Sequence, residues 1–233
     1  MTIALITGAS AGLGFALADA LADRGWTLVI DARGADALEQ ARLGLRARTE
    51  VVAIPGDVTD PAHRKALLTA AGRLGRLDLL VNNASHLGPS PQPRLEHYPL
   101  SELSRVYEVD VFSPLVLTQL ALPLLAASDG VVVNVSSDAA VEPYPGWGGY
   151  GSAKAALDQM TAVLAVEHPS LDVYAFDPGD MRTQMHQQAF PGEDISDRPE
   201  PATVVPAFIH LIEARPPSGR YRASDILSAP VVP

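Results

Sequence analysis

The chain has 233 residues, of which 47% are hydrophobic and 19% are charged. This composition excludes a disordered chain, and the length allows a sizeable core, so we expect one domain over residues 1–233. The formal net charge of −10 argues against nonspecific nucleic-acid binding. The sequence contains no cysteine, which excludes disulfides and thiolate metal sites.

The amino-terminal residues 1–7 are apolar but lack a basic flank and lead directly into glycine, which argues against a signal peptide. No apolar stretch is expected to be long enough to span a membrane. The histidines show no metal-ligand spacing, and we expect them at the surface. These observations predict a cytoplasmic protein with no membrane, nucleic-acid or metal partner.

Short apolar runs alternate with helical patterns along the chain. The runs predict strands at residues 3–7, 27–31, 50–54, 77–81, 131–135, 173–176 and 220–222. The helical patterns lie at 15–24, 35–48, 61–74, 101–127, 151–167 and 201–213, and Pro114 and Pro123 are expected to kink or divide the long one. This order predicts an α/β fold of the Rossmann type, a doubly wound parallel sheet of about seven strands with helices on both faces.

A glycine-rich turn, Thr-Gly-Ala-Ser-Ala-Gly-Leu-Gly at residues 7–14, joins the first predicted strand to the first helix. Glycines let the backbone approach a pyrophosphate, and the helix N-terminus offers N–H donors and a favourable dipole. The position after a strand and before a helix favours this use over a plain turn. The candidate cofactor contacts are Gly8, Ser10, Ala11, Gly12, Leu13 and Gly14.

The end of the second strand offers two residues that select between cofactors. Asp31 is suited to the adenosine ribose of NAD(H), whereas Arg33 is suited to the 2′-phosphate of NADP(H). Because Arg33 lies beyond the last apolar residue, where the chain should reach the ribose, we slightly favour NADP(H). The alternative is that Arg33 is only a solvated surface charge.

Polar residues also follow the third and fourth predicted strands. Asp57, followed by Val58, is placed to accept from the adenine amino group, or else to cap a turn or helix. Asn82 and Asn83, followed by Ala84, either stitch neighbouring strands together or line the cofactor cleft.

The fifth strand leads to the candidate catalytic residues. It ends at Ser136 and Ser137, and Tyr150 lies 13 residues after Ser137, with Lys154 four residues further on. Positions four apart share one face of a helix. An ammonium near the phenol favours the phenolate, so Lys154 is expected to lower the pKa of Tyr150 toward a useful working range.

After the sixth strand, Pro178 and Gly179 force a turn beside the predicted cleft, with Met181 close behind. Thr183 is then placed to donate to a carboxamide. Residues 184–200 are polar and contain Pro191, Gly192 and Pro199, which predicts an irregular substrate loop.

Taken together, these motifs make the chain resemble the short-chain dehydrogenase/reductase family over almost its full length. The resemblance implies that Ser137 polarises the substrate oxygen and that Tyr150 exchanges a proton with it. It implies that Lys154 binds the nicotinamide ribose and lowers the pKa of Tyr150, and that Thr183 holds the carboxamide.

Two positions depart from the family pattern. Ser85 stands where the family usually has a glycine, and Asp110 stands where it has an asparagine that completes the catalytic set. We keep Asp110 as a candidate catalytic residue. The alternative is that it only caps a helix break near Pro114 and faces away from the site.

The pattern predicts an NAD(P)-dependent enzyme that interconverts a small carbonyl compound and its alcohol, and that forms a homodimer or homotetramer. The alternative is a cofactor-binding regulatory or scaffold protein of the same fold with little turnover. Loops at residues 85–95, 139–149 and 184–200 are expected to build the substrate pocket, in which Tyr144, Trp147 and Phe190 suit a moderately apolar compound.

Overall fold

The computed structural model describes residues 2–228. Its seven strands form one parallel sheet in the order β3-β2-β1-β4-β5-β6-β7, which confirms the predicted Rossmann-type fold. The strands are β1 (Ile3–Ile6), β2 (Thr27–Ala32), β3 (Val51–Pro55), β4 (Leu79–Asn82), β5 (Val131–Val135), β6 (Asp172–Asp177) and β7 (Gly219–Arg222).

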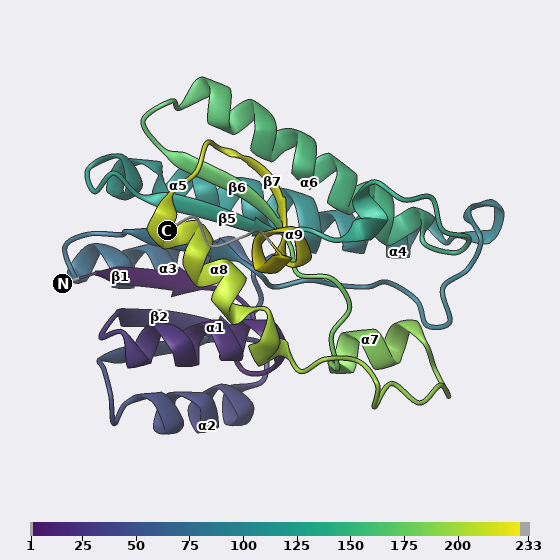
Figure 1. Cartoon of the computed structure of the whole chain (residues 1–233), viewed down its shortest axis with the longest axis horizontal. Coiled ribbons are helices and arrows are strands. Elements are labelled where there is room, and N and C mark those ends of the chain that lie inside the picture. The colour runs from purple at the N-terminus through teal and green to yellow at the C-terminus, as the bar shows by residue number, and fades with distance from the viewer. Residues whose placement is uncertain (1, 229–233) are drawn as a thin grey trace.

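Helices cover both faces of the sheet (Figure 1). They are α1 (Gly12–Asp23), α2 (Ala35–Leu45), α3 (Pro61–Arg73), α4 (Leu100–Tyr107), α5 (Ser113–Ala126), α6 (Gly148–Glu167), α7 (Gln184–Ala189), α8 (Val205–Ala214) and α9 (Ala223–Ser228). The helices α1, α2 and α8 pack on one face, and α3, α5 and α6 pack on the other. Central strands covered on both faces need apolar residues throughout, which explains the continuous apolar runs in the sequence.

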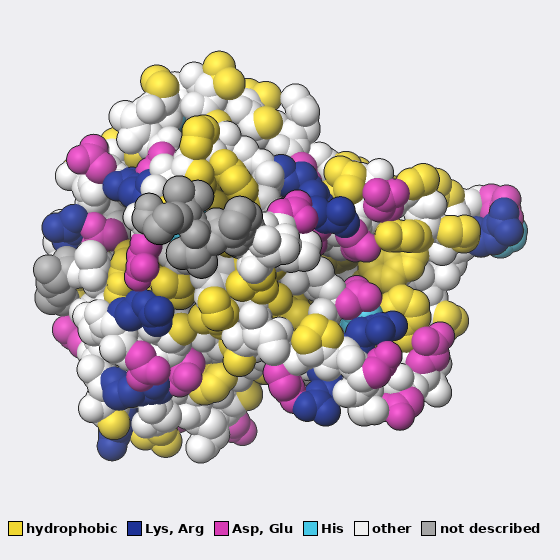
Figure 2. Space-filling view, viewed as in Figure 1, with side chains coloured by type: hydrophobic (Ala, Val, Ile, Leu, Met, Phe, Trp, Pro, Cys, Tyr) yellow, Lys and Arg dark blue, Asp and Glu magenta, His cyan; other side chains and the backbone are white. Residues whose placement is uncertain are grey.

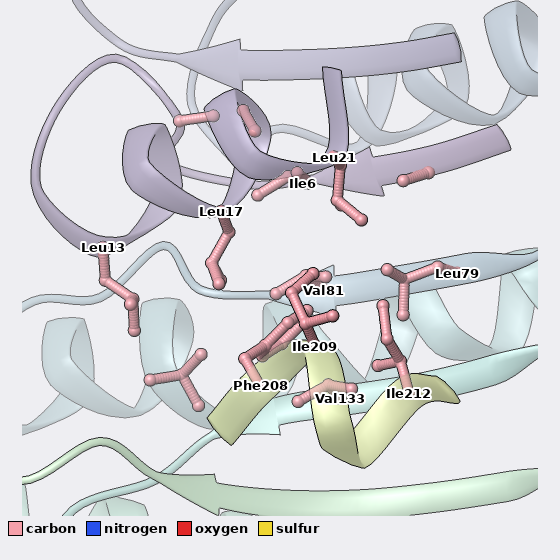
Figure 3. Packing of buried hydrophobic residues seen from close by; sticks show 14 of the residues in the cluster. Ile6, Leu13, Leu17, Leu21, Leu79, Val81, Val133, Phe208, Ile209 and Ile212 are labelled. Atoms are coloured by element: carbon pink, nitrogen blue, oxygen red, sulfur yellow. The ribbon is translucent and has the colours of Figure 1, made fainter. Parts of the chain in front are cut away.

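Figure 3 shows the core on the α1 and α8 face. Leu17 of α1 and Phe208 of α8 meet Val81 of β4 there, and none of the three side chains is exposed to solvent. Burying apolar surface of this kind is the main favourable contribution to folding, at roughly 25 cal/mol for each Å². The core therefore fixes the first helix, and with it the glycine-rich turn, against the centre of the sheet.

The strand order reverses between β1 and β4, and ligands of such sheets bind at the carboxyl ends of the strands beside that reversal. Ile6 near the end of β1 pairs with Ile30 of β2 and Val81 of β4, so these strands end at the same level. Helix α7 lies at this end of the molecule (Figure 1). The turns that carry the candidate site residues are thereby brought to one edge.

The long apolar helix predicted at 101–127 is divided just before Pro114 but not at Pro123. A π-helical segment at Glu108–Phe112 separates α4 from α5, while Pro114 lies in the first turn of α5 and Pro123 lies inside that helix. A wider turn of this type inserts an extra residue and re-aims side chains, and it occurs frequently at functional sites. The division places Asp110 within the π segment.

The same stretch corrects the expectation about membrane-spanning length. Residues Leu100–Ala126 are long and apolar enough, with a mean hydropathy of 1.7, to meet the usual criterion for a membrane helix. Half of the apolar window is buried inside the protein, and α5 packs against α3, β4 and β5. A core helix of this kind meets the same criterion without crossing a membrane.

Three other expectations also change. Residues 184–200 are not wholly irregular, because they begin with helix α7, which Thr183 caps by accepting from the N–H of His186 at 3.2 Å. His63 and His186 are buried and not at the surface. Helix α9 directly follows β7 and was not expected.

Acidic and basic side chains are interspersed on the face shown in Figure 2. The residues that the structure describes contain no group of three or more histidine, aspartate and glutamate side chains arranged to hold a metal ion.

Candidate active site

The glycine-rich turn forms a cradle between β1 and α1. Gly8 and Gly12 adopt φ angles of 67° and 57°, a region that residues with a Cβ rarely enter. A Cβ on Gly14 would lie 2.5 Å from the carbonyl oxygen of Gly8 and from the amide nitrogen of Asn83, so the cradle leaves no space for a side chain. Within the described residues no side chain caps the start of α1, which leaves its first N–H groups for a ligand.

Asn83 and Thr7 fix this cradle to the end of β4. Asn83 Nδ2 donates to the carbonyl oxygens of Thr7 at 2.8 Å and Gly8 at 3.2 Å. Thr7 Oγ1 accepts from the N–H groups of Asn83 at 3.0 Å and Ala84 at 2.9 Å. Asn82 instead donates to Asn134 of β5 at 2.7 Å. Both asparagines therefore stitch strands together, and Asn83 also lines the cleft.

Asp31 is already engaged within the protein. Its Oδ1 accepts from the N–H of Gly8 at 2.8 Å, its Oδ2 lies 2.9 Å from Nε2 of His63, and its side chain is 1% exposed. Burial raises the pKa of Asp31, and the bonds from His63 and Gly8 act in the opposite direction. Both carboxylate oxygens thus have partners within the protein, and Asp31 is also among the residues that line the cleft.

Arg33, by contrast, is exposed and lines the cleft beside Asp57 and Val58. Among the residues that the structure describes it forms no ion pair within 4.0 Å. Burial raises the pKa of Asp57, but the hydrogen bonds from Thr59 and then the charge of Arg33 leave that pKa below its usual value. Asp57 does not cap α3, because Asp60 does so by accepting from the N–H of Ala62. Asp57 accepts instead from the backbone and hydroxyl of Thr59, at 2.9 and 2.8 Å.

Ser137, Tyr150 and Lys154 converge where β5 ends and α6 begins, and all three line the same cleft. Ser137 starts a short 3-10 helix, and its hydroxyl donates to Asp138 Oδ1 at 3.0 Å. Lys154 Nζ donates to the carbonyl oxygen of Val135 at 3.0 Å and lies 5.4 Å from the centre of the Tyr150 ring. Helix α6 begins at Gly148, three residues earlier than predicted, which places Tyr150 in its first turn.

The net effect on Tyr150 differs from the sequence expectation. Burial raises the pKa of Tyr150, and Lys154 lowers it but does not outweigh the burial. The Lys154 ammonium therefore lowers the pKa of Tyr150, as predicted, but the net effect of all the surrounding groups is to raise that pKa. Burial also works against the charge of Lys154, but attraction to Tyr150 and Asp110 leaves the pKa of Lys154 above its usual range.

Asp110 faces this cluster and not the outside of the helix break. Its side chain is completely buried, and Oδ1 lies 3.4 Å from Lys154 Nζ. It accepts from the hydroxyl of Ser85 and from the N–H of His86 at 3.2 Å. Burial raises the pKa of Asp110 against the opposing attraction of Lys154. The two departures from the family pattern, Ser85 and Asp110, are thus in direct contact.

The turn after β6 closes the far side of the cleft. Gly179 has a φ of 72° and donates its N–H to Asp177 Oδ1 at 3.0 Å. Pro178, Gly179, Met181 and Thr183 all line the cleft, as predicted. A Cβ on Gly12 would lie 3.6 Å from Cγ2 of Thr183, so this turn lies directly across from the glycine cradle.

Sequence reasoning missed an arginine that connects these parts. Arg220 of β7 donates from Nη2 to the carbonyl oxygen of Ser137 and to Asp177, and from Nε to Asp158 of α6. The three partners belong to three different elements that carry site residues. The pairing of β7 with β6 brings Arg220 next to Ser137 and Asp177. A single arginine in a short strand forms no sequence motif that would have pointed to this position.

The cleft has a volume of about 730 Å³, within the range of sites for small molecules and cofactors. Beyond Ser137 and Lys154, one part of its wall is apolar: Leu87 and Tyr150 pack with Trp147, Met185 and Ala189. The ring centre of Trp147 lies 5.9 Å from those of Tyr150 and Phe190. The three loops predicted to build the pocket thus each contribute to it or adjoin it.

Comparison with known proteins agrees with this geometry. The family model of the short chain dehydrogenases matches residues 2–194. The chain belongs to the short-chain dehydrogenase/reductase family. It is an NAD(P)-dependent oxidoreductase of that family, which favours the enzyme over the scaffold alternative.

Individual relatives show the extent of the similarity. Sepiapterin reductase of Mus musculus is 36% identical over an alignment of 201 residues that covers 80% of this chain and 77% of that protein. The rhamnolipids biosynthesis 3-oxoacyl-[acyl-carrier-protein] reductase of Pseudomonas aeruginosa is 37% identical over an alignment of 194 residues that covers 78% of this chain and 74% of that protein. A short chain dehydrogenase from Shigella flexneri, solved in complex with NADP, is 29% identical, with a TM-score of 0.89 over 96% of this chain and 97% of that one.

Proposed function

We propose that the chain catalyses reversible hydride transfer between NADP(H) and a small carbonyl compound or its alcohol, with Tyr150 as the proton donor and acceptor. The observation that carries the proposal is the meeting of Ser137, Tyr150 and Lys154 in one cleft with the glycine cradle. When bound, the nicotinamide supplies or accepts the hydride. The residues of this chain bind and orient the reactants and move the proton.

Each candidate catalytic residue has a role that follows from its chemistry. The Ser137 hydroxyl is a hydrogen-bond donor for the substrate oxygen, which polarises the carbonyl. The Tyr150 phenol gives a proton to that oxygen during reduction and removes it during oxidation. Lys154 holds a positive charge beside Tyr150 and stabilises the phenolate.

The preference for NADP(H) rests on the contrast between Arg33 and Asp31. Arg33 is exposed at the cleft, whereas both oxygens of Asp31 already have partners inside the protein. A guanidinium at this position binds a phosphate with charge-assisted hydrogen bonds. The NADP in the related Shigella flexneri structure agrees with this preference.

The substrate class follows from the pocket wall. Trp147, Met185 and Leu87 offer apolar contact, and the acidic side chains of Asp138 and Asp180 lie at the same cleft. Negative charge disfavours an anionic ligand. We therefore propose a neutral, moderately apolar ketone or aldehyde. The two relatives described above carry the names of reductases with different substrates. Their names therefore do not single out one substrate for this chain, and we propose only a class of compounds.

The test begins with the purified protein and a titration with NADPH and NADH, followed by nicotinamide fluorescence. We expect tighter binding of NADPH. A panel of neutral aromatic and aliphatic ketones, with matched keto acids, then reports turnover by loss of NADPH absorbance. Turnover of neutral ketones supports the proposal, and binding of NADPH with no turnover of any carbonyl compound would contradict it.

We also propose that residues 1–233 form one domain and that the protein is a cytoplasmic homodimer or homotetramer. Exposed apolar side chains on the outer helices support association: Phe112 is 45% exposed, Leu120 45%, Val163 44% and Val166 81%. Analytical ultracentrifugation tests this proposal, and a monomer at micromolar concentration would contradict it.

A further inference from the structure

The hydroxyl of Ser137 forms hydrogen bonds with two neighbours on its own turn. It donates to Asp138 Oδ1 at 3.0 Å and accepts from the N–H of Ala139 at 3.2 Å. A serine hydroxyl has one proton to give and lone pairs that accept. With these contacts in place, Ser137 keeps a lone pair for a ligand but has no proton left for the oxygen of a substrate carbonyl.

Asp138 lies beside Ser137, and both residues line the cleft. Asp138 Oδ1 also accepts from the N–H of Ala139 at 2.8 Å, and Oδ2 accepts from the hydroxyl of Tyr144 at 3.1 Å. Arg220 holds the backbone of Ser137 by donating to its carbonyl oxygen at 2.9 Å. Ser137 Oγ and Asp138 Oδ1 are therefore two oxygens fixed next to each other at the wall of the cleft.

The proposed role of Ser137 requires the proton that Asp138 accepts. To polarise a carbonyl, the hydroxyl must donate to the substrate oxygen, and it then no longer donates to Asp138. Loss of a donor to a partly buried carboxylate carries a free-energy cost. A substrate that brings its own donor to Asp138 avoids this cost, and it frees the Ser137 proton for the carbonyl.

The spacing of the two oxygens indicates where the substrate carries this donor. Ser137 Oγ and Asp138 Oδ1 lie 3.0 Å apart. The two oxygens of an α-hydroxy ketone are on adjacent carbons, and they can take up a separation close to that of two hydrogen-bonded oxygens. The carbonyl oxygen can then accept from Ser137 while the neighbouring hydroxyl donates to Asp138.

We propose that Asp138 is a specificity-determining residue and that the preferred substrates are neutral ketones with a hydroxyl group on the carbon next to the carbonyl. This inference rests on the proposed function, in which Ser137 polarises the carbonyl. The substrate hydroxyl takes the place of Ser137 on Asp138 and keeps its proton. The carbonyl carbon receives the hydride and its oxygen receives the proton of Tyr150, so the product is a vicinal diol.

The remaining wall of the cleft suits the rest of such a substrate. Leu87, Trp147 and Met185 offer apolar contact to the groups on either side of the two oxygens. The same carboxylate disfavours an α-keto acid, because that compound would place a negative charge beside Asp138 where the ketone places a hydroxyl. The substrate class therefore combines one pair of adjacent oxygens with an apolar remainder.

Binding to the enzyme–NADP⁺ complex tests the role of Asp138 without turnover. The probe is α-hydroxyisobutyrophenone, whose tertiary hydroxyl cannot be oxidised by hydride transfer, and its methyl ether is the matched compound with no proton to donate. Isothermal titration calorimetry gives both dissociation constants for wild type, Asp138→Ala and Glu142→Ala. Glu142 is an exposed acid of the same loop that is not among the residues lining the cleft, so its variant controls for the loss of charge.

In wild type the hydroxy ketone should bind roughly tenfold more tightly than its methyl ether, because it alone donates to the carboxylate. Asp138→Ala should remove most of this preference, and Glu142→Ala should leave it unchanged. Asp138→Asn, which keeps an acceptor oxygen without the charge, should give an intermediate preference, and it takes the place of Asp138→Ala if circular dichroism shows that the alanine variant does not fold. Equal binding of the two ketones to wild type, no binding of the hydroxy ketone, or a preference that survives the loss of Asp138 would overturn the inference.

Turnover with NADPH separates this inference from the proposed function. The value of kcat/KM in wild type should be higher for the hydroxy ketone than for its methyl ether by a similar factor. Equal values for the two ketones would contradict the substrate class alone. Absence of turnover of any carbonyl compound would contradict the proposed function, while the binding measurement would still decide the role of Asp138.

Discussion

Arg220 donates a hydrogen bond from Nη2 to the carbonyl oxygen of Ser137 at 2.9 Å, and the same nitrogen donates to Asp177 at 2.8 Å. Arg220 therefore holds the proposed polarising serine to the strand that carries the turn at Gly179. Through Nε it also reaches Asp158, which lies four residues after Lys154 on α6. Arg220 is a positioning residue, since it acts on the site only through its partners.

The first prediction concerns this arginine. Arg220→Met should lower kcat/KM by roughly tenfold to a hundredfold, because small displacements of reacting groups carry costs of that size. Steady-state kinetics measure the loss, with Arg215→Met as the control, since Arg215 forms an exposed ion pair with Asp172 at the opposite end of β6. Equal effects of the two substitutions would show that Arg220 does not position the site.

The cofactor preference depends on Arg33. Arg33→Ala should weaken NADPH binding by roughly tenfold or more and leave NADH binding nearly unchanged, because only NADPH presents a 2′-phosphate for a charge-assisted contact. Fluorescence titration with both cofactors provides the two dissociation constants. Arg46→Ala, in the turn after α2, controls for the loss of one positive charge. Similar losses for both cofactors would mean that Arg33 does not select between them.

Tyr150 carries the proton transfer in the proposed function. Tyr150→Phe should reduce turnover by at least the roughly 10²–10⁴-fold expected for loss of a general acid or base, while NADPH binding stays nearly intact. Tyr221→Phe is the matched control, because its phenol bonds to the carbonyl oxygen of Pro217 and is not among the residues that line the cleft. Near-full activity of the Tyr150→Phe enzyme on a good substrate would exclude this role.

His63 and Asp31 make a prediction about stability. His63→Ala removes one partner of a buried carboxylate and should lower the free energy of unfolding by about 1–3 kcal/mol. Urea denaturation measures the difference, and His97→Ala, at an exposed position, should have almost no effect. A midpoint unchanged by His63→Ala would show that Asp31 gains nothing from this contact.

The sequence by itself determined the fold class and most of the cleft. Alternating apolar runs and helical patterns predict the parallel sheet, because strands buried on both faces need continuous apolar residues. Fixed chain order and short turns then place Gly8, Ser137, Tyr150 and Lys154 at one edge. Local sequence spacing is enough to predict where these residues lie, because each is at the end of a strand or in the first turns of the helix that follows the strand.

Contacts between distant segments were decided only by the tertiary structure. The sequence marked Ser85 and Asp110 as separate departures, but the π-helical segment at Glu108–Phe112 is what turns Asp110 onto Ser85 and Lys154. The engagement of Asp31 by His63, 32 residues away, and of Ser137 by Arg220, 83 residues away, likewise has no local signal. The net pKa direction of Tyr150 also needed the structure, because burial, which outweighs the nearby ammonium, is a property of the packed chain.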